Sequence, residues 1–597
     1  MALALAALAA LVAPDAAGQD TAPRSLIPVS PATGQPEVPQ PETAPSQPPD
    51  PAAGPTAPTS SEATTTADTI TIGQLAAPDP ASIGLMTERD GGLGVEMWRG
   101  TPRALVELLL PRLPVEHGSA ALTALARRLL LSTATPPAGP GGENLLDLRI
   151  ERLAAMGDLD SVTALLRQVP ESDASDMIAR ADIERRWLVG DFAGACAIAS
   201  DMLDADGGNE WLAAMAFCQA LDQRPETAQL AVSLLREEGM DDPAFFTLID
   251  ALTGNSENRL ESLARPTPLH LAMLRAARQA VPDDALDGSD PAMLAAIARA
   301  PNASVELRLA AAERAQALGT LPARDLGQVY VNVPFTAEER ANALAIAERL
   351  EPAKANALLY QVAQIEAVPT ARAEALATAW SIAWNSDRYP TVARVNRGAT
   401  LDLEPVPELV WIAADAGRAL LLTGDVEQAY RWMALARQQA TPANPDAVKA
   451  VIDLWPPLQL ADWQGRLPWS PEVLGHWWDA TQDQDMVTRI ERGTILFTLF
   501  EALGYDIPRP LWLPLLGGPV LEPAEVPRSG LWQALEDAAA GGRQGEVVLL
   551  GLILVGQNGP AGTNLKVLHD VVRGLRTVGL DRAAREIALE AAVAHGF

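Results

Sequence analysis

Two cysteines are the residues of this 597-residue chain whose type and spacing point most directly to a covalent bond. Cys196 lies six residues after Gly190, and Cys218 lies five residues before Gln223. If the loop between them centres near Gly207, each cysteine is 11 residues from its centre, so antiparallel helices bring them level. In an exported protein this arrangement predicts a Cys196–Cys218 disulfide. The alternative is a pair of buried thiols that fill small apolar spaces.

No arrangement of residues in the sequence matches a catalytic or metal-binding motif. The histidines are scattered and form neither an HExxH motif nor an i, i+4 pair; they are His117, His270, His476, His569 and His595. There is no nucleophile elbow and no P-loop, and "DADGGNE" at 204–210 lacks the ligand offsets of a calcium loop. We therefore predict a protein without catalytic activity, cofactor or metal. An enzyme whose carboxylates meet only after folding is the least favoured alternative.

Tryptophans are concentrated in one proline-containing segment. Between 455 and 478 lie five of the 14 tryptophans of the chain: Trp455, Trp463, Trp469, Trp477 and Trp478. Proline at this density predicts loops and short helices. Indoles supply large, stiff contact surfaces, so one interpretation is a site that binds a partner protein or a glycan. The other is that the indoles pack a joint between two helical arrays.

The elements that must position these residues are helical hairpins with a repeated turn. The pairs Gly157-Asp158 and Gly190-Asp191 are 33 residues apart, and Gln223 follows after another 33. The pattern returns at Gly424-Asp425 and at Gly579. Glycine adopts the left-handed conformation that ends a helix, and an aspartate after it can cap the next helix.

A small residue follows each turn at a fixed distance. Five residues after the turn stand Val162, Ala195, Ala228, Ala429 and Ala584. A small side chain at this position allows two helices to cross closely. After Gly424, Val426 and Met433 lie on the same helical face as Ala429, which predicts a buried seam.

A period of 33 residues with small residues at the crossing resembles tetratricopeptide and Sel1-like repeats, which stack helix pairs into solenoids. The resemblance is good at 143–238 and isolated at 409–438 and 567–597. Irregular helix pairs between 290 and 450 resemble the superhelical part of soluble lytic transglycosylases of bacterial envelopes, although no lysozyme-like catalytic domain follows. The resemblance implies an all-α solenoid of antiparallel helical hairpins that acts as an envelope scaffold. Unrelated helical hairpins are the alternative.

The composition narrows the classes of partner. The chain carries 45 basic and 76 acidic residues, a formal net charge of −31, and 48% of its residues are hydrophobic. Such a charge repels phosphate backbones and anionic lipids, so we expect no binding to nucleic acid. The run "VVLLGLILVG" at 547–556 is too short for a transmembrane helix and predicts a core helix, so we expect no transmembrane span in the folded part.

The first 78 residues differ from the rest. Residues 1–18 have an apolar run and small residues before Gln19, which predicts a signal peptide. No Lys or Arg precedes the run, so residues missing upstream would make a membrane anchor the alternative. Residues 19–78 are rich in Pro, Thr and Ala and are predicted to be a disordered linker. A periplasmic or otherwise exported location is therefore expected.

The predicted organisation continues with three further parts. They are a helical-repeat array over 79–454, a Trp- and Pro-rich irregular connection over 455–530, and C-terminal helical hairpins over 531–597. The predicted function is an exported, non-catalytic scaffold that mediates protein–protein interaction in the bacterial envelope. The alternative is an accessory protein that binds the cell wall or a glycan, with peptidoglycan as the candidate ligand.

Overall fold

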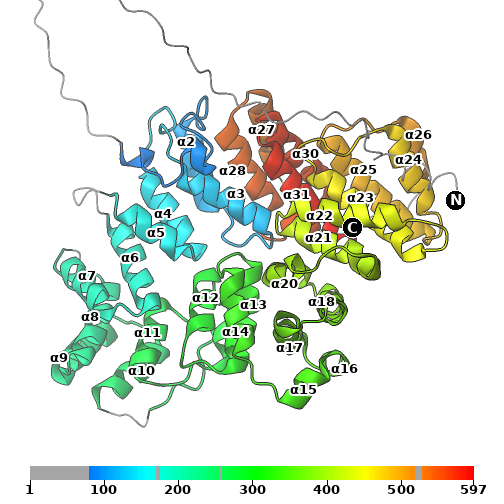
Figure 1. The fold of residues 1–597 in the computed structure, drawn as a ribbon. Coiled ribbons are helices and arrows are strands. Elements are labelled where there is room, and N and C mark those ends of the chain that lie inside the picture. Colours follow the sequence, from blue (N-terminus) through cyan, green and yellow to red (C-terminus); the bar gives the residue numbers. More distant parts are fainter. Residues whose placement is uncertain (1–78, 170–174, 206, 255–257, 518–527) are drawn as a thin grey trace, which may run out of the picture. The chain divides into compact units, whose positions relative to one another are not determined.

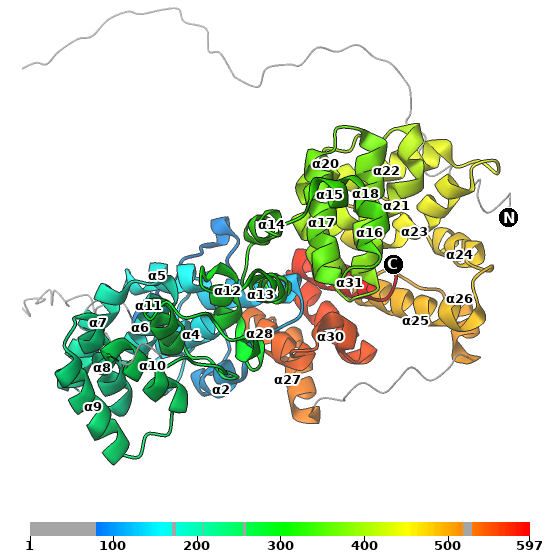
Figure 2. The same ribbon diagram turned by 90° about the horizontal axis from the view of Figure 1, so that it is seen from below.

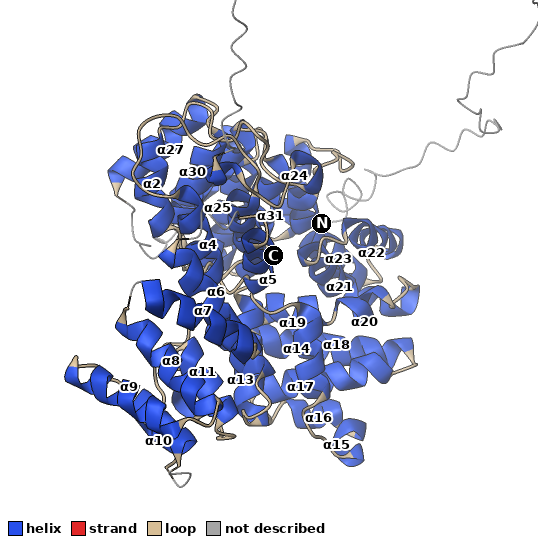
Figure 3. Cartoon of the chain, turned by 90° about the vertical axis from the view of Figure 1, so that its left-hand side faces the viewer, coloured by secondary structure: helices blue, strands red, loops and turns tan. Residues whose placement is uncertain are grey.

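The structure of the chain is a computed structural model that describes residues 79–169, 175–205, 207–254, 258–517 and 528–597. The predicted signal peptide (1–18) and linker (19–78) lie outside the described residues. Within the described ranges the chain is helical and contains no strand, only two isolated bridges, Met86 to Ser132 and Pro102 to Ala138 (Figure 3). The prediction of an all-α solenoid is confirmed.

The helices of the first half follow one another along the chain, some joined by tight turns and others by longer loops (Figure 1). Their bounds are α2 Arg103–Leu109, α3 Ala120–Leu131, α4 Leu145–Ala155, α5 Leu159–Leu166, α6 Asp176–Val189, α7 Phe192–Ala205, α8 Asn209–Leu221, α9 Pro225–Glu237, α10 Pro243–Thr253, α11 Pro268–Ala276, α12 Pro291–Arg299, α13 Val305–Ala317, α14 Ala323–Val331, α15 Ala337–Ala341 and α16 Ala343–Ala347.

The second half continues in the same way (Figure 2). Its bounds are α17 Pro352–Ile365, α18 Pro369–Trp384, α19 Tyr389–Val395, α20 Arg397–Leu401, α21 Ala413–Leu422, α22 Val426–Gln439, α23 Pro445–Ala461, α24 Pro471–Ala480, α25 Met486–Ala502, α26 Arg509–Trp512, α27 Ser529–Ala540, α28 Gln544–Val555, α29 Gly559–Gly562, α30 Leu565–Thr577 and α31 Asp581–Ala594.

The repeated turns end helices as predicted. All five turn residues have the left-handed backbone conformation, with φ of 76°, 80°, 60°, 79° and 83° at Gly157, Gly190, Gln223, Gly424 and Gly579. The small residues after the turns are completely buried, each at 0% exposure: Val162, Ala195, Ala228, Ala429 and Ala584. Close helix crossing therefore explains the small side chain at these positions.

The aspartates that follow the turns do not all act as caps. The Asp158 and Asp191 carboxylates accept hydrogen bonds from the backbone N–H of Ser161 (3.3 Å) and Gly194 (3.1 Å). Asp425 makes no such bond. Its carboxylate instead accepts from the Arg397 guanidinium at 2.6 Å, so the prediction of a cap was wrong at this copy of the turn. An arginine partner does not by itself prevent capping, because Asp158 and Asp191 also pair with arginines, Arg127 (2.7 Å) and Arg186 (2.6 Å).

The buried apolar residues form two clusters, and one of them joins the two ends of the described chain. The second cluster covers most of α6 to α14, whereas the first contains both the helices before α6 and those from α16 onward. In particular, α3 contacts α28 and α31 (Figure 1). The Glu590 carboxylate of α31 accepts hydrogen bonds from Ser119 and from the backbone N–H of Ala121 (3.2 Å). The repeat pattern contains no sign of this contact.

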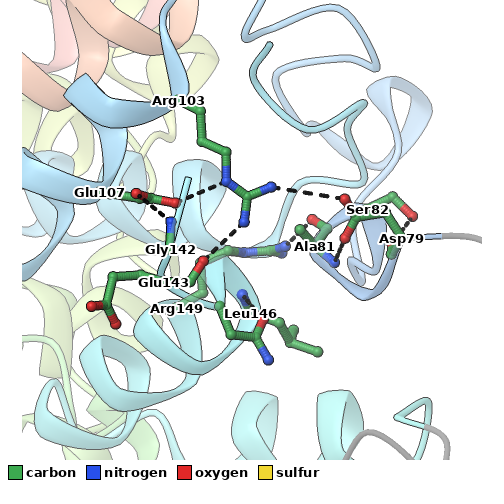
Figure 4. Close-up of polar contacts among 10 residues, drawn as sticks. Asp79, Ala81, Ser82, Arg103, Glu107, Gly142, Glu143, Leu146 and Arg149 are labelled. Carbon is green, nitrogen blue, oxygen red and sulfur yellow. Dashed lines mark hydrogen bonds and ion pairs between the residues drawn. The ribbon is translucent and has the colours of Figure 1, made fainter. Parts of the chain in front are cut away.

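Two arginines hold the first described residues against the helices (Figure 4). The buried Arg149 donates to the carbonyls of Ala81 (3.1 Å) and Ile83 (2.7 Å). Arg103 pairs with Glu107 at 2.8 Å and lies 4.0 Å from Asp79. The folded part therefore includes residues 79–83.

The tryptophan-rich segment is more helical than its prolines predict. α23 continues through Pro456 and Pro457 to Ala461, and α24 and α25 follow within the predicted irregular connection 455–530. Residues 518–527 of that segment lie outside the described part. The predicted core helix at 547–556 corresponds to α28, which is almost entirely buried. No helix in the described ranges has the length and apolar character needed to cross a membrane.

Candidate partner-binding groove

The predicted cysteine pair is brought together by two adjacent helices. Cys196 lies on α7 and Cys218 on α8, with Cα atoms 5.7 Å apart and the sulfur atoms at disulfide distance. α7 and α8 contact each other along their lengths. The geometry therefore suits the predicted disulfide, which would crosslink two successive helices of the repeat.

Four of the five candidate partner-binding tryptophans lie in an aromatic joint between α23, α24 and α25. Trp455 stacks on Trp469 with ring centroids 6.4 Å apart, and Trp477 donates its indole N–H to the Ile452 carbonyl at 3.1 Å. Trp455, Trp477 and Trp478 are buried and Trp469 is half-buried. Packing therefore accounts for these four side chains.

Trp463 is different, because 56% of its surface is exposed. It stands just after the end of α23, at the edge of a groove of about 440 Å³. Three elements form the walls: the turn between α21 and α22, the residues after α23, and one face of α31. The turn at Gly424 and the helix that follows the turn at Gly579 thus meet at one site.

The groove contains more carboxylates than cations. Its lining includes Asp425, Glu427, Asp462 and Glu586 against Arg582 and Arg585. Three of these acids have cationic partners. Asp425 pairs with Arg397, Glu427 with Arg466 (2.6 Å) and Glu586 with Arg582 (2.9 Å).

Asp462 is the exception on the floor of the groove. It is only 2% exposed, accepts a hydrogen bond from the backbone N–H of Leu467 at 2.7 Å, and forms no ion pair with any described residue. Burial, together with the neighbouring Asp462 carboxylate, raises the pKa of Tyr430 beside it. The pKa of Arg466 is raised mainly by its hydrogen bond to Glu427 and also by the Asp462 charge, so Asp462 has a cation nearby but none in direct contact among the described residues. A buried carboxylate without a direct ion pair favours a positively charged or hydrogen-bond-donating ligand group.

The chain itself shows how a cation fits here. The Arg466 guanidinium lies over the Tyr430 ring at 5.5 Å and pairs with Glu427. Arginine against an aromatic face beside a carboxylate is a favourable arrangement for a basic side chain. Trp463 provides a second, exposed aromatic surface in the lining of the groove.

Sequence reasoning identified Trp463 but missed the other groove residues. Asp462, Tyr430 and Arg585 come from three elements that only folding brings together, and only the cluster of tryptophans marked the region. Among the described residues, no group of three or more His, Cys, Asp or Glu side chains is arranged to hold a metal ion.

Comparisons with known proteins assign this chain to no family and point to no function. No family model matches the chain, and no curated protein or solved structure matches it.

Proposed function

We propose that this protein is an exported, non-catalytic helical-repeat scaffold of the bacterial envelope, and that the Trp463 groove binds a basic segment of a partner protein. The helix pairs that pack against their neighbours support this proposal. So do two sequence resemblances, that of the 33-residue spacing to tetratricopeptide repeats and that of the irregular helix pairs at 290–450 to the superhelical part of lytic transglycosylases. The observation that carries it is the exposed Trp463 beside the unpaired Asp462.

The chemistry of the groove specifies the partner. An exposed indole at the rim of a concave site is typical of an interaction hot spot. The unpaired carboxylate on the floor and the net charge of −31 select a lysine or arginine. A short basic segment therefore places its charged group near Asp462 and an apolar part on Trp463.

Site-specific crosslinking in the native host tests this proposal. A photoreactive residue at Gln464, inside the groove, is compared with one at Arg324, an exposed position outside it. We expect a partner to crosslink from 464 only, and Trp463→Ala and Asp462→Asn each to remove the crosslink in folded protein. Equal crosslinking from both positions, or an unchanged pattern in the variants, would contradict the groove as the binding site.

A glycan is the second candidate ligand. The groove is lined by the exposed Trp463 and by the amides of Gln428 and Gln464, a combination that suits stacking and hydrogen bonding to a sugar ring. Sedimentation with purified peptidoglycan distinguishes the two candidates. Binding that Trp463→Ala removes and Asp462→Asn leaves intact favours the glycan. Binding to a basic peptide that both variants weaken favours the protein partner.

A further inference from the structure

A second cavity, separate from the Trp463 groove, lies where α18, α21, α23 and α25 meet. It has a volume of about 470 Å³, within the range of sites that hold small molecules. Two indoles, Trp380 and Trp384, line one side. Cationic side chains from three helices reach the same cavity: Arg418 of α21, Lys449 of α23 and Arg492 of α25.

Two of these cations are neutralised by acids within the cavity. The Arg418 guanidinium pairs with Asp415 at 2.7 Å and also donates to the main-chain oxygen of Phe597. Lys449 pairs with Asp453. Both acids of the cavity are therefore engaged.

Arg492 has no such partner. Among the described residues it forms no ion pair and no hydrogen bond, and its Nε atom is buried without an acceptor. Its guanidinium lies over the Phe597 ring at 4.6 Å. Burial lowers the pKa of Arg492; the nearby Asp453 charge opposes this effect, and the Arg418 charge, with a smaller effect, adds to it. A partly buried guanidinium that no anion contacts directly is unfavourable for folding, so a bound anion would offset its cost.

We propose that this cavity binds a small organic anion whose carboxylate or phosphate group is held by the Arg492 guanidinium, with Arg418 adding positive charge. Arginine presents parallel N–H donors that match a planar carboxylate or a phosphate. The partly exposed indole of Trp384 offers an apolar surface for the body of the ligand. Gln484, whose side-chain oxygen is buried without a donor among the described residues, is an acceptor for a hydrogen-bond donor that the ligand carries. This proposal is independent of the function proposed for the groove.

The test measures the melting temperature of the full chain in sodium acetate and in sodium phosphate against sodium chloride of equal ionic strength. We expect a saturable rise with acetate, phosphate or both; acetate alone indicates a carboxylate ligand and phosphate alone a phosphate ester. In Arg492→Gln the apparent affinity falls about tenfold or more, as expected for the loss of a charge-assisted pair of hydrogen bonds. The matched control is Arg431→Gln, an exposed arginine paired with Glu404 outside the cavity, which keeps the wild-type response.

A second variant separates binding from folding. Arg492→Lys keeps the charge but loses the planar guanidinium, so we expect a folded protein with weaker anion binding. In chloride, Arg492→Gln should be at least as stable as wild type, because it removes an unpaired cation. No saturable rise with either anion, or the same rise in wild type and Arg492→Gln, would overturn the proposal.

Discussion

The helices α6 to α9 and the region from α21 to α31 use the same turn in different ways. In α6 to α9, each helix packs mainly on its neighbours in the chain, with α10 and α11 beside them. From α21 onward, helices distant in sequence meet: α23 contacts α31, α25 contacts α30, and α28 contacts α3. The first region is a local repeat. The second builds the groove and the cavity, because only contacts between distant segments bring charged groups of several helices together.

The tryptophans of the region from α21 to α31 are also of two kinds. In the distant-contact region, the buried indoles hold helices together, whereas Trp463 stands at the surface. Replacing one buried tryptophan and, separately, Trp463 therefore tests whether different tryptophans stabilise the fold and bind a partner in this region.

The largest effect is expected for Trp455→Ala. Its indole is 1% exposed and contacts Trp469, Trp477 and Phe500, so its removal leaves a large cavity. We expect a loss of about 3–5 kcal/mol in the free energy of unfolding, measured by denaturant titration. Trp463→Ala is the control and should cost less than about 1 kcal/mol. Equal losses would show that Trp463 is also a packing residue.

Reduction of the Cys196–Cys218 pair should weaken the local repeat. A crosslink between residues 22 apart restricts the unfolded chain, and its loss should cost about 3 kcal/mol in the chain-entropy model. Unfolding of the oxidised and reduced protein measures this difference, and mass spectrometry after alkylation counts free thiols. In a Cys196→Ala, Cys218→Ala double variant, reductant should leave the free energy of unfolding unchanged, and alkylation should add no mass. Two free thiols in the protein isolated without reductant would contradict the bond.

Acid should weaken the contact between the two ends of the chain through His117. Burial lowers the pKa of His117 to about 4 from an ordinary value of 6.5. Its backbone lies so close to Gly559 that a Cβ there would meet the His117 carbonyl at 2.9 Å. The unfolded chain takes up a proton below about pH 6.5 and the folded chain does not. Stability is therefore full above pH 6.5 and falls as the pH decreases toward 4.

At pH 5 this difference amounts to about 2 kcal/mol of unfolding free energy. His117→Phe should remove this part of the loss, because neither ring nitrogen has a hydrogen-bond partner among the described residues. Denaturant titrations of both proteins at pH 7.5 and pH 5 measure it. The same acid-induced loss in wild type and His117→Phe would assign it to other groups.

The smallest effect is expected at the repeated turn. Asp191→Ala removes a helix cap together with the ion pair to Arg186 and should cost about 1 kcal/mol, whereas Asp191→Asn loses the ion pair but keeps the acceptor and should cost less. Asp425→Asn removes the charge that pairs with Arg397 without removing a cap. Thermal unfolding of the three variants compares the two copies. A larger loss for Asp191→Asn than for Asp191→Ala would show that capping is not the role of this residue.

The sequence predicted the parts of the fold that depend on neighbouring residues. The 33-residue spacing located the turns at Gly157, Gly190 and Gln223, since a left-handed turn residue and a small residue five positions later serve one helix pair. The cysteine pairing followed from the same local register. The prolines at 456 and 457 predicted a loop or a short helix, and this was wrong, because burial within α23 outweighs their usual effect on a helix.

The amino-acid sequence by itself determined that this protein is an all-α array of helix pairs, where its turns fall, and which two cysteines face each other. These properties arise from hydrogen bonds and packing within a few tens of residues. Only the tertiary structure decided that α3 packs on α28 and α31, that four tryptophans are at least half-buried while Trp463 is exposed, and that Asp462 and Arg492 form no ion pair with a described residue. Those outcomes depend on which distant surfaces bury one another, and helical periodicity carries no information about that choice.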